Sequence, residues 1–191
     1  RPAPRRHTRS LREGWVFAPQ ELDSSTSITE LRAVAEPITV PHTWNAVDGQ
    51  LGGNYRRGRS TYARRIEALL PEHRTWIEFE GVNSSAEVHL DGALLAQHDG
   101  GYSTFRVDVT DHLKDGAGTL VVVVDNAPNE TVYPQQADFT FYGGIYREVR
   151  QITVDPVHVA LDHHGGPGLS VTPHIDGTRA QVEVLARITG A

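Results

Sequence analysis

Short segments in which hydrophobic and polar residues alternate follow one another along most of the chain. Residues 75–80, 86–91 and 105–109 each place apolar side chains at every second position. A period of two is what a β-strand with one buried face requires. Residues 120–124 read Leu-Val-Val-Val-Val, apolar at every position, which predicts a central strand covered on both faces.

Turn residues separate these segments at intervals that suit an all-β fold. Asp91-Gly92 lies between two short strands and predicts a hairpin with a type I′ turn, because both central residues must accept a positive φ. A single helical turn is expected at residues 110–113, capped by Thr110 or Asp111. No stripe with a period of 3.6 residues is sustained anywhere. The pattern therefore predicts an all-β, jelly-roll β-sandwich.

Changes in pattern divide the chain into three parts. Residues 1–13 are basic and lack apolar periodicity, so we expect a flexible tail. Residues 14–155 form the predicted jelly roll. Asp155-Pro156 interrupts the pattern, and residues 156–191 hold about three further strands, which are too few to close an immunoglobulin-like sandwich. We expect this last part to be the truncated start of such a domain. Its uncovered apolar faces should pack against the jelly roll, pair with a second copy or be mobile.

Composition excludes several classes of function. A net charge of −6 argues against a nucleic-acid-binding surface. No apolar run approaches the roughly 18 residues of a membrane helix, so no membrane partner is expected. The chain has no Cys, and its 10 His show no metal-binding spacing, so we expect no metal and no cofactor. Neither a Gly-x-Ser-x-Gly elbow nor a phosphate-binding loop in a strand-to-helix context occurs. The compartment stays open, with a slight preference for the cytoplasm.

One segment combines an acid, aromatic residues and a glycine pair. It runs Asp138-Phe-Thr-Phe-Tyr-Gly-Gly-Ile-Tyr-Arg-Glu-Val-Arg, residues 138–150. Carboxylates bind sugar hydroxyls, and aromatic faces stack on pyranose rings. The alternative is structural: the glycine pair makes a tight turn, the aromatic residues fill the core, and Arg147 pairs with an acid. Both interpretations stay open on these residues alone.

Four motifs in order resemble glycoside hydrolase family 2, which contains β-galactosidases, β-glucuronidases and β-mannosidases. They are Val-Pro-His-Thr-Trp-Asn at 40–45, Gly-Val-Asn-Ser-Ser-Ala-Glu-Val-His-Leu-Asp-Gly at 81–92, His-Asp-Gly-Gly-Tyr-Ser-Thr-Phe at 98–105, and the segment that opens with Asp138. The last is the most specific, because it meets the family's Asp-x5-Gly-Ile-x-Arg-x-Val pattern in full. The resemblance covers most of residues 14–155.

The resemblance implies an N-terminal sugar-binding domain of a retaining hydrolase. The order of domains would be a jelly roll, an immunoglobulin-like domain and a TIM barrel that carries both catalytic glutamates. No residue of this chain is then catalytic, and the chain alone should be inactive. The aspartate that opens the last motif binds the terminal sugar's hydroxyls in the family, a role that carries to Asp138. Asn54 is the second expected substrate-binding residue. His42 and Trp44 are expected to be packing residues.

The expected partners are a terminal β-glycoside and the TIM barrel of the same protein, and a homo-oligomer is left open. A β-galactoside is the favoured substrate, because the loops at 52–54 and 141–144 look most like that branch. The rival hypothesis is a stand-alone carbohydrate-binding or adhesion module on the same scaffold, without hydrolase activity. Fold alone does not separate the two.

Overall fold

The computed structural model describes residues 6–48, 55–70, 72–113, 115–133 and 140–190. The elements, in chain order, are β1 (His7–Ser10), β2 (Trp15–Ala18), α1 (Ile28–Val34), β3 (Glu36–Ile38), β4 (Arg59–Glu67), β5 (Arg74–Phe79), β6 (Ser85–Leu90), β7 (Ala93–Asp99), β8 (Phe105–Asp108), the 3-10 helix η1 (Thr110–His112), β9 (Ala117–Asp125), β10 (Val149–Val154), β11 (His158–Val159), β12 (Leu169–Asp176), β13 (Arg179–Ala186) and β14 (Ile188–Thr189).

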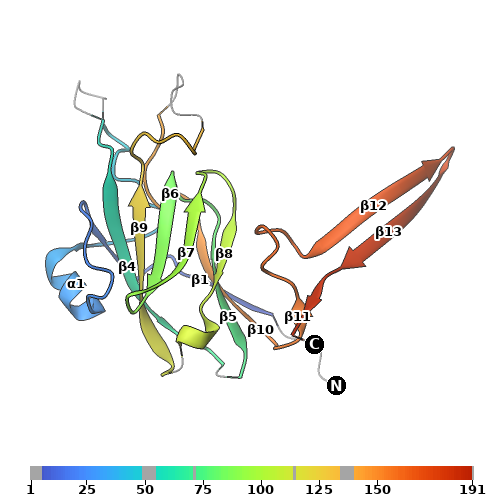
Figure 1. The fold of residues 1–191 in the computed structure, drawn as a ribbon, viewed down its shortest axis with the longest axis horizontal. Coiled ribbons are helices and arrows are strands. Elements are labelled where there is room, and N and C mark those ends of the chain that lie inside the picture. The colour runs from blue at the N-terminus through green and yellow to red at the C-terminus, as the bar shows by residue number, and fades with distance from the viewer. Residues whose placement is uncertain (1–5, 49–54, 71, 114, 134–139, 191) are drawn as a thin grey trace.

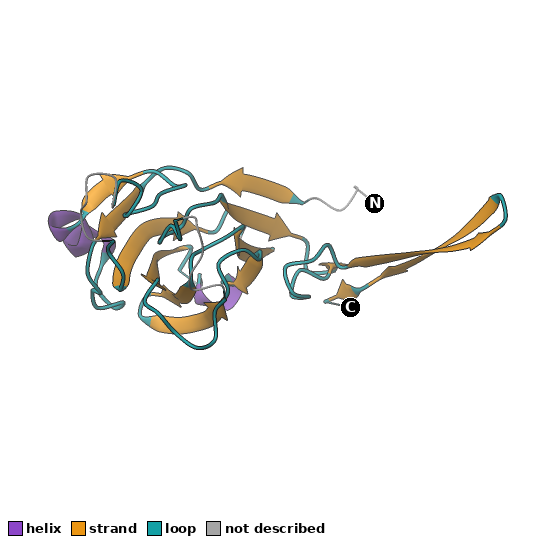
Figure 2. Ribbon diagram, turned by 90° about the horizontal axis from the view of Figure 1, so that it is seen from above, coloured by secondary structure: helices purple, strands orange, loops and turns teal. Residues whose placement is uncertain are grey.

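Two antiparallel sheets face each other and form the sandwich (Figures 1 and 2). Within the described residues, one sheet has the six-stranded order β3-β2-β4-β9-β6-β7, and the other has the four-stranded order β1-β10-β5-β8. Large side chains from both sheets, including Trp15, Tyr62, Phe79 and Ile77, are fully or almost fully buried between them. The prediction of an all-β jelly roll is confirmed.

Strand β9 shows why one segment is apolar at every position. Val122 and Val124 point into the core between the two sheets. Val121 and Val123 point to the opposite face, where they pack with Ile28 of α1. The helix therefore covers the outer face of the six-stranded sheet at this point, and the prediction of a strand covered on both faces is confirmed.

Helix α1 was not predicted from the sequence. Its N-terminus is a capping box, in which the Ser27 side chain accepts from the backbone N–H of Glu30 and the Glu30 carboxylate accepts from the backbone N–H of Ser27. The Ser-x-x-Glu motif is a known start signal, but a helix of 7 residues is too short to show a hydrophobic stripe. The predicted helical turn exists as η1, although no side chain caps it; Thr110 instead accepts from the backbone N–H of Thr75.

The predicted turn between β6 and β7 is confirmed by its backbone angles. Asp91 has φ of 47° and Gly92 has φ of 84°, the two positive values that a type I′ turn needs. Residues 7–11 differ from the expectation of a flexible tail over residues 1–13. Strand β1 pairs with β10 along four residues, and Leu11 is 1% exposed. A strand at the edge of a sheet needs only backbone groups for this pairing, so its sequence shows little periodicity.

The segment after β10 first returns to the sandwich and then leaves it. Leu161 packs with Trp76, Ile152 and Val154 on the outer face of the four-stranded sheet. Arg106 donates to the backbone carbonyls of Leu161 and Gly166, at 3.2 Å and 2.7 Å. The β12–β13 hairpin then projects away from the sandwich, and all its strand residues are exposed (Figure 1). The expected packing against the jelly roll is thus found near Leu161 and not in the hairpin.

Candidate functional site

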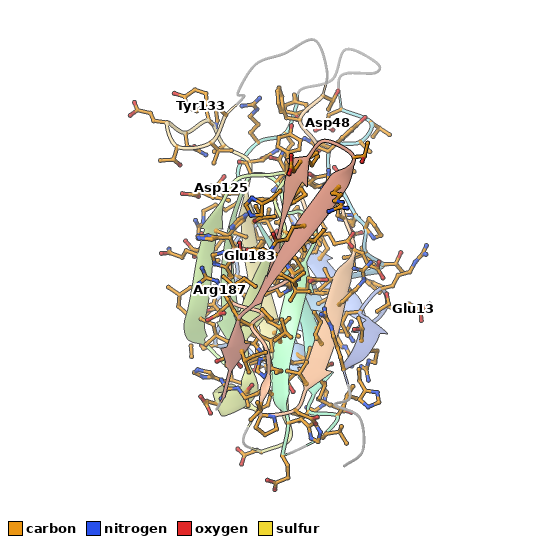
Figure 3. The ribbon with its side chains drawn as sticks, turned by 90° about the vertical axis from the view of Figure 1, so that its right-hand side faces the viewer. Glu13, Asp48, Asp125, Tyr133, Glu183 and Arg187 are labelled. Atoms are coloured by element: carbon orange, nitrogen blue, oxygen red, sulfur yellow. The ribbon has the colours of Figure 1, made fainter. Side chains whose placement is uncertain are left out.

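The two predicted substrate-binding residues, Asp138 and Asn54, lie outside the described residues. The described chain next to them lies at one end of the sandwich. Figure 3 shows Asp48 and Tyr133 at this end, and each directly precedes one of the two segments concerned. The described residues that precede the two segments therefore lie at the same end of the fold, which we call the loop end.

A buried asparagine joins two segments of the loop end that are almost 100 residues apart. Asn45 is 0% exposed. Its amide nitrogen donates to the carbonyl of Phe141 at 3.2 Å, and its side-chain oxygen accepts from the backbone N–H of Gly143 at 2.9 Å. The Thr43 hydroxyl donates to the same oxygen at 2.8 Å. One amide thus satisfies polar groups of both segments, which fixes them relative to each other.

A second set of contacts holds the described residues that flank positions 49–54. The Asp48 carboxylate accepts from the backbone N–H of Arg56 at 2.7 Å. Asn126, at the end of β9, accepts from the Gly58 N–H at 2.9 Å and donates to the Arg56 carbonyl at 3.3 Å. The Arg56 guanidinium lies 5.3 Å from the centre of the Trp44 ring. The described residues on both sides of these positions are therefore tied to the sandwich.

Asn83 holds the other segment from the opposite side. Its amide nitrogen donates to the Tyr142 carbonyl at 2.9 Å, and its backbone exchanges two hydrogen bonds with Gly144. Neither glycine of the pair has room for a side chain. A Cβ on Gly143 would overlap the Trp44 indole and the Asn126 amide, and one on Gly144 would overlap the Tyr62 hydroxyl. Close packing therefore requires both glycines, whereas the structural interpretation had expected the pair to make a tight turn.

A cluster of aromatic rings packs against the glycine pair. Phe17 lies 4.8 Å from His42, 6.0 Å from Trp44 and 5.0 Å from Tyr62, measured between ring centres. Nδ1 of His42 is 2.7 Å from the Tyr62 hydroxyl. Burial lowers the pKa of His42 and raises that of Tyr62. Both groups are therefore neutral at pH 7, and His42 and Trp44 pack as expected.

The structural interpretation of residues 138–150, in which the aromatic residues fill the core and Arg147 pairs with an acid, agrees only in part with the structure. Phe139 lies outside the described residues, whereas Phe141 is half-buried and Tyr142 is 44% exposed. Tyr142 therefore does not fill the core of this chain. Arg147 donates to the backbone carbonyl of Tyr102 at 3.2 Å and lies over the Tyr146 ring, so the expected pairing with an acid is replaced by a carbonyl contact.

The described residues also bear on metals and membranes. No group of three or more His, Cys, Asp or Glu residues among them could hold a metal ion. No helix in the described ranges is long and apolar enough to span a bilayer.

Comparison with known proteins decides the family. Residues 37–155, well over half of the chain, match the family profile described as "Glycosyl hydrolases family 2, sugar binding domain". The chain belongs to glycoside hydrolase family 2. The matched range includes the asparagines of the loop end and the whole of the motif that opens with Asp138. The resemblance drawn from the four motifs is thereby confirmed.

Relatives of this family 2 chain carry two kinds of name. A β-glucuronidase of Bacteroides fragilis is 34% identical over 156 residues, which cover 79% of this chain and 22% of that protein. A β-galactosidase of Thermoanaerobacterium thermosulfurigenes is 30% identical over 170 residues, covering 81% and 23%. The chain thus spans about a fifth of the length of these curated relatives.

Solved structures of family 2 proteins share the fold. A Bacteroides uniformis β-glucuronidase superposes with a TM-score of 0.86 at 29% identity, over 94% of this chain and 22% of that chain. An FMN-binding β-glucuronidase from Facaelibacterium prausnitzii L2-6 gives a TM-score of 0.80 at 38% identity, over 96% and 28%.

Proposed function

We propose that this chain is the N-terminal sugar-binding part of a retaining β-glycosidase and that its loop end faces the substrate. The family match over residues 37–155 carries the proposal. In such a protein a TIM barrel supplies the acid/base and nucleophilic glutamates, and the two carboxyl groups work across the scissile bond. The chain described here contributes binding groups and no catalyst, so it should hydrolyse no glycoside by itself.

The proposed domain division follows the contacts. Residues 14–155 form the sugar-binding domain, and β1 adds an edge strand to it from the preceding segment. Residues 156–191 begin a second, immunoglobulin-like domain. The exposed β12–β13 hairpin supports this division, because Val171, Ile175 and Val184 are each more than 60% exposed and require a covering sheet.

Asp138 and Asn54 are the proposed sugar-binding residues. The tied segments on either side of them support this role. Asn45 fixes Phe141 and Gly143, which follow Asp138, while Asp48 and Arg56 enclose the loop that contains Asn54. A group that binds sugar hydroxyls must be held in place before the substrate arrives, because ordering it during binding weakens the affinity.

The substrate is proposed to be a terminal β-glycoside with a β-D-glucuronide or a β-D-galactoside as the sugar. The loops at 52–54 and 141–144 favour the galactoside. Among relatives that match more than three quarters of this chain, the names favour the glucuronide, since the proteins at 34% and 38% identity are β-glucuronidases, whereas a β-galactosidase at 38% identity matches only 50% of the chain. Activity of the full-length protein on the two nitrophenyl glycosides, measured side by side, decides between them.

The test of the site is Asp138→Asn in the full-length protein. A hydrogen bond from a sugar hydroxyl to a charged acceptor contributes roughly 1.5–3 kcal/mol, so kcat/KM should fall by about 10- to 150-fold if the bond persists in the transition state. The melting temperature should stay within about 1 °C of wild type, since the amide keeps the shape of the carboxylate. Asp111→Asn, on the 3-10 helix η1 of the jelly roll, is the matched control, because Asp111 is exposed; it should change neither quantity.

Two results contradict this proposal. Unchanged kinetics per folded molecule together with a large fall in melting temperature would assign Asp138 to a structural role. Hydrolysis by the 191-residue chain alone, lost on mutation of one of its own residues, would show that the catalyst lies within this chain.

A further inference from the structure

Tyr142 presents an exposed ring from a backbone that is fixed on both sides. Its side chain is 44% exposed. Its carbonyl accepts from the Asn83 amide at 2.9 Å, and the N–H of the next residue, Gly143, donates to Asn45 at 2.9 Å. Asn83 is 7% exposed and Asn45 is 0% exposed. Two buried amides thus hold the peptide group that follows Tyr142.

The two glycines after Tyr142 are closely packed, which restricts the conformation of the backbone at this point. Gly143 is enclosed by Trp44 and Asn126, and Gly144 has φ of 126° and lies against the Tyr62 hydroxyl and the His42 carbonyl. A residue with a side chain would clash at either position. The position of the Tyr142 Cα is therefore set by the core, even though its ring is not part of the core.

The side chain of Tyr142 suits a sugar. Its phenol presents an apolar ring and a hydroxyl from the segment that Asn45 and Asn83 hold. A pyranose has the matching chemistry, because one face of its ring presents C–H groups and its edge presents hydroxyls.

We propose that Tyr142 is a substrate contact whose ring packs against the apolar face of the pyranose, and that Asn45 and Asn83 are its positioning residues. The inference rests on the proposed function and extends it to a residue that the family's aspartate motif does not assign. An aromatic side chain on a fixed backbone loses little conformational entropy on binding. The two buried amides and the glycine pair hold the backbone of Tyr142 in place before a substrate binds.

The experiment uses the full-length protein and compares Tyr142→Phe with Tyr142→Ala. The phenylalanine keeps the ring, so its KM should stay within about twofold of wild type. The alanine removes the ring, so KM should rise by about 2- to 12-fold, the range of a single aromatic contact. The inhibition constant of the free monosaccharide product should rise by the same factor. Leu94→Ala is the control, because Leu94 is an apolar residue that is 52% exposed and lies near the start of β7, at the end of that strand away from the β7–β8 loop; KM should not change.

Three results overturn the inference. The first is an unchanged KM in Tyr142→Ala. The second is an equal rise in KM in Tyr142→Phe and Tyr142→Ala, which would assign the effect to the hydroxyl. The third is a melting temperature several degrees lower in Tyr142→Ala with unchanged KM, which would mean that the ring packs against another part of the protein. Asp138→Asn is measured in parallel: normal kinetics in that variant refute the proposed role of Asp138 and leave the result for Tyr142 to stand separately.

Discussion

Replacing Asn45 by leucine tests whether one buried amide holds the loop end together. Leucine has nearly the shape of asparagine but can neither donate nor accept. The Gly143 N–H, now paired with Asn45 at 2.9 Å, would be left buried without its acceptor, and the Phe141 carbonyl would lose its donor at 3.2 Å. The substitution therefore removes hydrogen bonds without opening a cavity.

The expected loss of stability follows from these two groups. Leaving a buried polar group unpaired costs about 1–3 kcal/mol. Phe141 is only half-buried, so water can reach its carbonyl, whereas Gly143 is buried. The apolar leucine offsets part of the loss. We expect the free energy of unfolding to fall by about 2–3 kcal/mol. Thr43→Val, which removes only the hydroxyl contact to Asn45, should cost less than about 1 kcal/mol.

The Asn45→Asp variant adds a second test, in which the stability of the protein is measured as a function of pH. The carboxylate keeps the acceptor for Gly143 but places a negative oxygen against the Phe141 carbonyl in a fully buried position. Burial should raise the pKa of this aspartate above its unfolded value of about 3.9. The destabilisation is then complete at pH 7 and diminishes as the pH falls through the folded pKa, since the protonated acid can donate to Phe141.

The measurements are urea unfolding, followed by tryptophan fluorescence, and hydrogen exchange of residues 141–144. Asn45→Leu should accelerate exchange in this segment and leave that of β9 close to wild type once global stability is subtracted. A stability within about 0.5 kcal/mol of wild type for Asn45→Leu, with unchanged exchange at Gly143, would refute the reasoning, because surface substitutions behave in that way.

Three further perturbations have defined outcomes. Arg106→Met removes the partner of the buried Glu78 carboxylate at 2.6 Å and leaves it only Arg150 at 3.4 Å, so it should cost about 3 kcal/mol in urea unfolding. Glu78→Leu together with Arg106→Met should recover at least half of this loss, because Arg150 keeps Glu80 and Glu148 as partners; equal losses in single and double variants would contradict this. Burial lowers the pKa of His42 from 6.5, so the unfolded state takes up the proton first, and thermal stability should fall as the pH drops below 6.5. His42→Gln should be less acid-sensitive than wild type, and parallel curves would disprove the assignment. Burial lowers the pKa of Arg64 to about 10, and no described carboxylate pairs with it. Arg64→Met should therefore raise stability by about 1 kcal/mol, and a loss above 1 kcal/mol would show that the charge is compensated.

Local patterns in the sequence were sufficient for the sheets. The alternation in residues 75–80 and 86–91 and the continuous run at 120–124 predict β5, β6 and β9, because each strand places successive side chains on opposite faces. The turn at Asp91-Gly92 needs only the φ preferences of two neighbouring residues. The family could also be recognised, since its motifs are contiguous stretches of sequence.

Contacts between distant segments could not be predicted in the same way. Nothing in the stretch around Asn45 indicates that its amide meets Phe141 and Gly143, because that meeting requires the whole sandwich to bring the two segments together. Strand β1 and helix α1 were missed because an edge strand and a helix of 7 residues derive their stability from packing and not from periodicity.

The sequence by itself determined the fold class, the main strands and the family, through side-chain periodicity and contiguous motifs. The tertiary structure decided which polar residues are buried, which aromatic residues stay exposed and which loop segments share an end of the sandwich. Tyr142 illustrates the division. The sequence left its ring equally suited to the core or to a sugar, and the structure leaves it 44% exposed. Burial is a property of three-dimensional packing, so only the folded chain could determine it.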